Sequence, residues 1–218
     1  MPVVSRTIYK RLWAALGTEP HALHGTIAQI AVLYEDLRIE LTGYEKQLPD
    51  LEAIGENYRR NYFVRRSIAT LLEFSIALKM LNENPDWQPI KDRFDKPSVE
   101  MWSAAMKYFK KHHLYLKKIR DDFGGHFGFS AAQWAVEHLV QDAIGSIEIY
   151  RKPLENKAGP KMRFASEFVS TAMCRHKGKK SFLEHFRHMY RTTVDGYKHA
   201  TNCVHIIVVA YLYDRFRP

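Results

Sequence analysis

Apolar side chains recur every three or four residues through most of this chain, and this helical period constrains the fold more than any other feature. The clearest case is the segment from about Glu56 to Asn82, where the positions of one face form a continuous, mostly apolar stripe: Val64, Ile68, Leu71, Leu72, Ser75, Leu78 and Leu81. Because side chains three and four residues apart share one face of an α-helix, this segment is predicted to be a helix buried along one side.

The same period predicts further helices, which end where prolines, glycines or asparagines interrupt the pattern. They are expected at about 5–16, 22–46, 98–122, 131–143, 165–176 and 181–215. Ser98 and Ser130 are candidate N-caps because a serine oxygen can accept from the first free N–H groups of a helix. Around 145–164 the apolar positions alternate instead, which predicts a short β-hairpin. The sequence therefore predicts an all-α helical bundle with a small β-hairpin insertion and a long C-terminal helix.

Length and composition place this bundle among globular proteins. With 218 residues, 46% of them hydrophobic and 13% aromatic, the chain can bury a sizeable core. We expect a single domain, 1–218, with its bundle core at about 20–145 and the hairpin and C-terminal helices at about 146–218. The N-terminus lacks the apolar run of a signal peptide, and the longest apolar stretch, His205 to Tyr213, is too short to cross a bilayer. The two cysteines match no disulfide framework and no metal-ligand spacing, which favours a reducing compartment. We therefore expect a cytoplasmic protein. Membrane attachment, a metal and a cofactor are not expected.

The positive charge is concentrated in one segment. The net charge is +9, and residues 151–191 hold 11 Lys or Arg and 3 Glu, which leaves 22 basic and 21 acidic residues elsewhere. Such a segment attracts polyanions, RNA or DNA first, and Lys177, Lys179 and Lys180 are its candidate nucleic-acid-binding residues. The alternative is a solvated surface that keeps the protein soluble.

The sequence Arg120-Asp121-Asp122-Phe123-Gly124-Gly125-His126 ends the helix predicted at 98–122. An arginine side chain binds phosphate as a permanently charged fork, and a histidine exchanges protons near neutral pH. On an unbroken helix these two side chains would lie roughly 120° apart in azimuth, but a Gly-Gly break allows the chain to turn and bring His126 towards Arg120. The arrangement can serve phosphodiester chemistry, or it can simply end a helix.

This motif, in a chain of long helices, resembles the HEPN superfamily of compact helical bundles. The signature of that superfamily is an arginine, a polar residue, a few further residues and a histidine at the end of a helix, and Arg120, Asp121 and His126 fit it. The resemblance implies metal-independent RNA cleavage by a homodimer, with Arg120 and His126 as catalytic residues in a cleft shared by both copies. Asparagine is commonest at the second position, so the carboxylate of Asp121 is a departure: it can orient Arg120, but it also partly neutralises the guanidinium and repels phosphate.

Three functions remain open at this point. The first is the HEPN-like endoribonuclease, by family analogy with toxin or phage-defence character and therefore with a possible inhibitory or antitoxin partner. The second is a non-catalytic HEPN-like module that binds nucleic acid or nucleotide, and the third is a protein-interaction domain whose Gly-Gly turn is purely structural. A homodimer is expected in addition, because an aromatic and aliphatic stripe from Phe182 to Tyr211 follows the last helix over its length.

Overall fold

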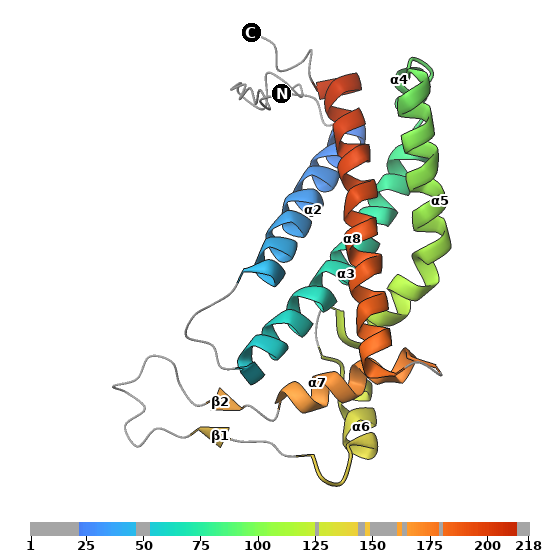
Figure 1. The fold of residues 1–218 in the computed structure, drawn as a ribbon. Helices are drawn as coiled ribbons and strands as arrows, with labels where there is room; N and C mark the ends of the chain where they lie inside the picture. The colour runs from blue at the N-terminus through green and yellow to red at the C-terminus, as the bar shows by residue number, and fades with distance from the viewer. Residues whose placement is uncertain are drawn as a thin grey trace. The chain divides into compact units, whose positions relative to one another are not determined.

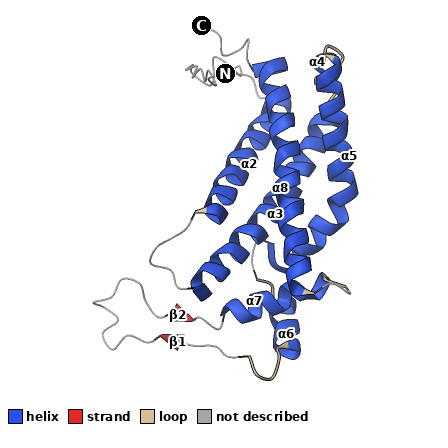
Figure 2. Ribbon diagram, viewed as in Figure 1, coloured by secondary structure: helices blue, strands red, loops and turns tan. Residues whose placement is uncertain are grey.

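The protein is an all-α helical bundle, as the helical period predicts. The computed structural model describes residues 22–46, 53–124, 127–143, 147–148, 161–162, 165–178 and 181–212. Figure 1 follows these segments along the chain, and Figure 2 shows how completely helix dominates them. The helix expected at 5–16 lies outside the described residues.

Four long helices carry most of the structure, and shorter elements connect them. The long helices are α2 (Ala22–Glu45), α3 (Ala53–Glu83), α5 (Lys96–Ile119) and α8 (Phe182–Ile207). The shorter helices are α4 (Gln88–Lys91), α6 (Phe129–His138) and α7 (Ala165–Met173). A π-helical turn, η1 (Arg120–Gly124), ends α5, a 3-10 turn, η2 (Cys174–His176), follows α7, and a second π-helical turn, η3 (Val208–Leu212), ends α8.

The stripe predicted for the central helix is confirmed. All seven of its positions are buried in α3, and Ser75, the most exposed of them, exposes 7% of its surface. The two predicted caps are wrong. Asp95, rather than Ser98, caps α5, because its Oδ1 accepts from the backbone N–H of Ser98 at 2.9 Å. Ser130 lies inside α6, whose N-cap residue is Gly128, and this helix ends at His138 rather than near residue 143.

The chain divides into two compact units. Unit 1 comprises the described parts of Met1–Glu35, Glu73–His112 and Asp195–Pro218, and unit 2 comprises those of Asp36–Leu72 and His113–Val194. Each of the four long helices contributes residues to both units.

Aromatic side chains form the interior of unit 1. Trp87 is completely buried between α3 and α4, with ring centroids 5.6 Å from Trp102 and 6.0 Å from Phe94. Phe74 and Phe109 join α3 to α5 at a centroid distance of 5.8 Å. Trp87 and Ile90 are buried although the sequence around them is polar, so the expected loop at this place includes the short helix α4.

Unit 2 contains a close approach of α2 to α3 and a second, smaller layer. A methyl group added to Gly43 would fall on the ring of Phe63, so a side chain at this position requires that ring to move. The smaller layer is formed by α6 and α7, whose buried alanines pack together at Ala131, Ala135 and Ala172. Small side chains allow these two short helices to approach closely, and this contact places the end of α7 near the end of α5.

The buried face of α8 differs from the predicted stripe. Its most buried positions are small or polar residues for the most part: His185, Met189, Thr192, Thr193, Ala200, Cys203, Ile206 and Ile207. Several predicted stripe residues are half-buried, and their rings stack on α2, Tyr44 on Tyr190 in unit 2 and Tyr34 on Tyr197 in unit 1. The stripe therefore contacts another helix of the same chain, and the homodimer stays a prediction.

The predicted hairpin corresponds to two strands of two residues each. β1 (Ile147–Glu148) pairs with β2 (Lys161–Met162) in antiparallel register, Ile147 opposite Met162. Within the described parts of the chain, none of the helices combines the length and apolarity that crossing a lipid bilayer requires.

Candidate functional site

The motif arginine lies where α5 changes from α-helix to the wider η1 turn. Arg120 is the first residue of η1, its side chain is 38% exposed, and its Nε lies 3.3 Å from Oδ1 of Asp121, whose side chain is 48% exposed. Wide π-helical turns inside or at the end of α-helices are frequent at functional sites. Arg120 and Asp121, two of the three residues of the predicted catalytic motif, are thus in contact, whereas His126 lies outside the described residues.

A second cluster lies at the same turn and was not predicted. The carboxylate of Asp122 accepts from Nε2 of His176 through one oxygen and from Nη1 of Arg175, at 3.3 Å, through the other. The same Nη1 also donates to the hydroxyl of Ser130, at 3.1 Å. Asp122 therefore ties η1 to the 3-10 turn η2 and to the first turn of α6.

The chemistry of this cluster follows from its atoms. An ionised carboxylate can only accept, so the Nε2 of His176 carries a proton, and in the neutral imidazole Nδ1 is then the acceptor. A carboxylate that fixes the tautomer and orientation of an imidazole in this way prepares it for proton transfer. The side chains of Asp122, His176 and Arg175 are 16%, 25% and 32% exposed, so solvent reaches all three.

Arg120 and Asp122 leave the turn in different directions. At about 80 to 100° per residue, two side chains two positions apart point to nearly opposite sides of a helical turn. The turn consequently has two faces, one with Arg120 and Asp121 and one with Asp122, His176 and Arg175.

The predicted basic residues are described only in part. Lys177 directly follows η2, is half-buried, and its backbone N–H donates to the carbonyl of Cys174 at 3.0 Å. Lys179 and Lys180 lie outside the described residues. Three consecutive basic residues therefore lie beside the single carboxylate of Asp122: Arg175, His176 and Lys177.

One acidic group of unit 2, Glu40, is buried and does not belong to the clusters at η1. Glu40 is 7% exposed, and burial raises the pKa of its carboxyl to about 7, although Thr70 donates to Oε1 at 2.9 Å and Arg66 lies 3.6 Å away. No hydrogen bond to its Oε2 is found among the described residues. A substrate in solvent cannot reach so buried a group, so Glu40 affects pH-dependent stability rather than a surface reaction.

The described residues contain no group of three or more His, Cys, Asp or Glu side chains placed to hold a metal ion. The side chains at η1 supply a guanidinium on one face and a carboxylate-bound imidazole on the other.

Comparison with models of known protein families, with curated proteins and with solved structures finds no match for this chain.

Proposed function

We propose that the protein is a metal-independent endoribonuclease that acts at the η1 turn. The observation that supports this most is the position of Arg120, whose side chain is 38% exposed, at the π-helical end of α5, beside a turn held in place by Asp122, His176 and Arg175. The excess of basic residues at 151–191, which includes η2, favours a polyanionic substrate. The HEPN-like motif, with His126 six residues after Arg120, supports RNA as that polyanion.

The proposed reaction needs one proton acceptor, one proton donor and a cation. One His126 takes the proton of a ribose 2′-hydroxyl, and the 2′-oxygen attacks the adjacent phosphorus. The bond to the 5′-oxygen breaks, and this oxygen takes a proton from the His126 of a second copy. Arg120 stabilises the negative charge that develops on the phosphoryl oxygens. The products are a 2′,3′-cyclic phosphate and a 5′-hydroxyl.

Asp122 is assigned a positioning role in this proposal. Its contacts with His176 and Arg175 fix the turn that begins with Arg120, so loss of its charge would loosen the turn without removing a reacting group. Asp122→Asn is expected to lower kcat about tenfold while the affinity for RNA stays within a factor of about two. Equal losses in kcat and affinity would contradict a positioning role.

Cleavage of a fluorescent single-stranded RNA in EDTA tests the assignment of Arg120 and His126. Arg120→Ala and His126→Ala should each lower the rate by about 10² to 10⁴, because each removes charge stabilisation or proton transfer. Arg93→Ala, which removes an exposed arginine of unit 1, is the matched control and should cleave at the wild-type rate. A 2′-deoxy substitution at the cleaved nucleotide should abolish the reaction, and full activity in His126→Ala would rule out the mechanism.

Mixing active and inactive protein tests whether two copies share the site. If each cleft needs the His126 of both copies, a mixed dimer of wild-type and His126→Ala protein keeps one histidine and should be inactive. An excess of His126→Ala protein should therefore lower the activity of the wild-type protein below that of the wild-type protein alone. A monomeric mass by light scattering, together with full activity, would contradict the shared cleft.

The second candidate function is RNA binding without cleavage, and the row of basic residues Arg175, His176 and Lys177 favours it. In that case wild-type protein binds RNA with an affinity that falls steeply with salt, and Lys177→Gln weakens binding while no product forms. Binding that does not depend on salt would exclude both this candidate and the nuclease.

A further inference from the structure

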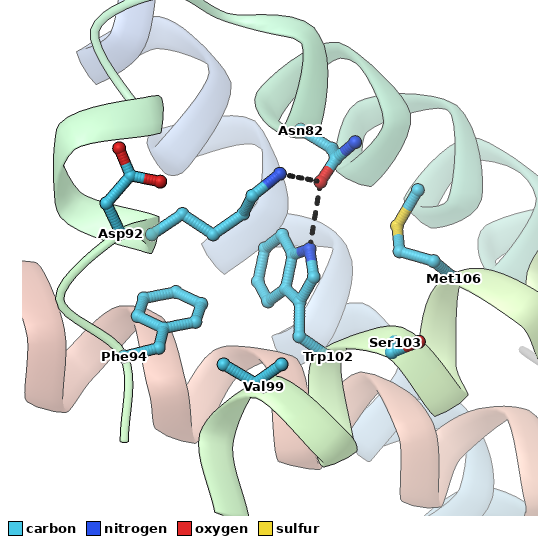
Figure 3. A pocket seen from close by; sticks show the side chains of 8 residues that line it. Asn82, Asp92, Phe94, Val99, Trp102, Ser103 and Met106 are labelled. Carbon is cyan, nitrogen blue, oxygen red and sulfur yellow. Dashed lines mark hydrogen bonds between the residues drawn. The ribbon is translucent and has the colours of Figure 1, made fainter. Parts of the chain in front are cut away.

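Unit 1 contains a pocket that the proposed nuclease does not use. It has a volume of about 480 Å³, within the range of small-molecule sites. It lies where the chain leaves α3, forms α4 and begins α5 (Figure 3). Its lining is Asn82, Lys91, Asp92, Phe94, Val99, Trp102, Ser103 and Met106.

The apolar part of the lining is built from packed aromatic rings. Trp102 is 4% exposed, and its ring lies 5.8 Å from Phe94 and 5.6 Å from the completely buried Trp87, measured between centroids. Aromatic rings at these separations stabilise one another. Val99 and Met106, from the same face of α5 as Trp102, extend the apolar surface.

The polar part of the lining is organised by one atom. Oδ1 of Asn82 accepts from Nζ of Lys91 at 3.2 Å and from Nε1 of Trp102 at 3.0 Å (Figure 3). The two donors define which end of the amide is oxygen, so the Nδ2 of Asn82 is left as a donor. The ammonium of Lys91 has no carboxylate within 4.0 Å among the described residues, and Asn82 uses one of its three protons.

This lining selects a ligand chemistry. An aromatic and aliphatic wall favours a planar apolar body, and an ammonium beside an amide N–H favours one negative group. The carboxylate of Asp92 stands at the edge of the pocket and points away from Trp102 (Figure 3), where it repels a second negative charge. We propose that this pocket binds a planar aromatic monoanion, with its ring on Trp102 and Phe94 and its charge on Lys91 and Asn82.

Two fluorescent probes with the same ring system test the proposal. 8-Anilinonaphthalene-1-sulfonate carries one negative charge, and N-phenylnaphthalen-1-amine is its neutral counterpart. The wild-type protein should bind the sulfonate at one saturable site about tenfold more tightly than the neutral probe, because a hydrogen bond to a charged group contributes about that much. Equal affinities for the two probes would overturn the assignment of an anion site.

Substitutions in the lining locate the site. Lys91→Met keeps the apolar stem and removes the charge, so it should weaken the sulfonate about tenfold and leave the neutral probe within about twofold. Ser103→Trp should fill the pocket and abolish binding of both probes. Lys79→Met, at a lysine of unit 1 whose side chain is 69% exposed, is the control and should bind both probes as the wild type does.

Folding of each variant is checked by near-ultraviolet circular dichroism. If Ser103→Trp fails to fold, Val99→Trp provides the block, because Val99 is 49% exposed and tolerates a larger side chain at less cost. Unchanged sulfonate affinity in both Lys91→Met and a folded blocking variant would show that the probe binds elsewhere, and the proposal would be withdrawn. RNA cleavage does not enter this test, so the pocket and the nuclease can fail independently.

Discussion

The interiors of the two units differ in chemistry. In unit 1 the buried side chains are apolar apart from two uncharged hydroxyl residues, Thr26 and Ser75. In unit 2 three charged side chains are buried, Glu40, Arg59 and Arg65, exposed by 7%, 8% and 6%. The tryptophan-rich cluster lies in unit 1, whereas the ion pairs of Asp122 lie in unit 2.

The difference shows where chemistry is available in this fold. A hydrocarbon interior contributes stability through buried area and shape, and this contribution does not depend on the charge of any side chain. A charged interior contributes stability only while each charge keeps its partner, since an unpaired buried charge is costly. Among the described residues the buried charged side chains lie in unit 2, so its stability should depend more strongly on single partners.

The largest expected loss of stability follows the removal of an aromatic side chain from unit 1. Trp87→Ala should lower the free energy of unfolding by about 3–5 kcal/mol, because the ring is completely buried against Trp102 and Phe94. Urea unfolding measures the change. Phe129→Ala, at an 84% exposed ring of unit 2, should change it by less than about 0.5 kcal/mol. A loss below about 1 kcal/mol for Trp87→Ala would mean that hydrocarbon packing does not dominate unit 1.

The next effect is the loss of a buried cation from unit 2. The guanidinium of Arg59 donates to the backbone carbonyls of Gly43 and Tyr44 and to Glu56. Arg59→Met leaves these acceptors without their donor and should cost about 2–4 kcal/mol. Arg60→Met is a close control, because Arg60 pairs with the same Glu56 at 3.9 Å while its side chain is 44% exposed. Hydrogen exchange should show the loss of protection mainly in unit 2. A uniform loss over both units would contradict the inferred difference between them.

Glu40 makes the stability of unit 2 sensitive to alkali. Because burial raises the pKa of its carboxyl from 4.5 to about 7, the folded state holds this proton more tightly than the unfolded state does. The resulting stabilisation is complete below pH 4.5 and is lost as the pH rises through about 7. Glu40→Gln, which mimics the protonated acid, should be more stable than the wild type at pH 8 by on the order of 2–3 kcal/mol and equal to it at pH 4. The exposed Glu45 of the same helix provides the control, and an identical pH profile for Glu40→Gln and the wild type would contradict the assignment.

The smallest expected effect is a loss of stability as the pH falls, and it arises in unit 1. Burial, reinforced at His112 by Lys111, lowers the pKa of His112 and of His199, whose rings flank Tyr108. The unfolded state therefore binds these protons more readily, so stability is lost as the pH falls below the ordinary value of 6.5. Replacing both histidines by glutamine should flatten the acid side of the profile measured by urea unfolding. A slope that survives the double substitution would assign the acid sensitivity to other groups.

The helices of this fold could be predicted from the sequence because their signal is local. The stripe of α3 is a repeat within one segment, and all seven of its positions are buried as expected. The caps were harder to predict, since Asp95 and Ser98 both offer a suitable oxygen and only the backbone conformation decides between them. In α8 the apolar stripe and the buried face differ, because tertiary packing turned threonines, an alanine and His185 inward.

The site could be predicted only where its residues are neighbours in the chain. Arg120 and Asp121 are adjacent, and the structure keeps them paired. Asp122 meets Arg175 and His176 across more than fifty residues, and no pattern in the sequence encodes a contact that depends on how α6 packs on α7. The only signal of this contact in the sequence was a pair of carboxylates at the end of one helix and a basic run after a later helix. The pocket of unit 1 was missed for the same reason, because Asn82 and Trp102 meet only after the chain has reversed at α4.

The close approach at Gly43 has a consequence for substitutions. The atoms nearest to a methyl group at position 43 belong to the ring of Phe63, so the two positions share one volume. An alanine at 43 requires this ring to move or to be replaced by a smaller side chain. Substitutions at the two positions should therefore be energetically coupled.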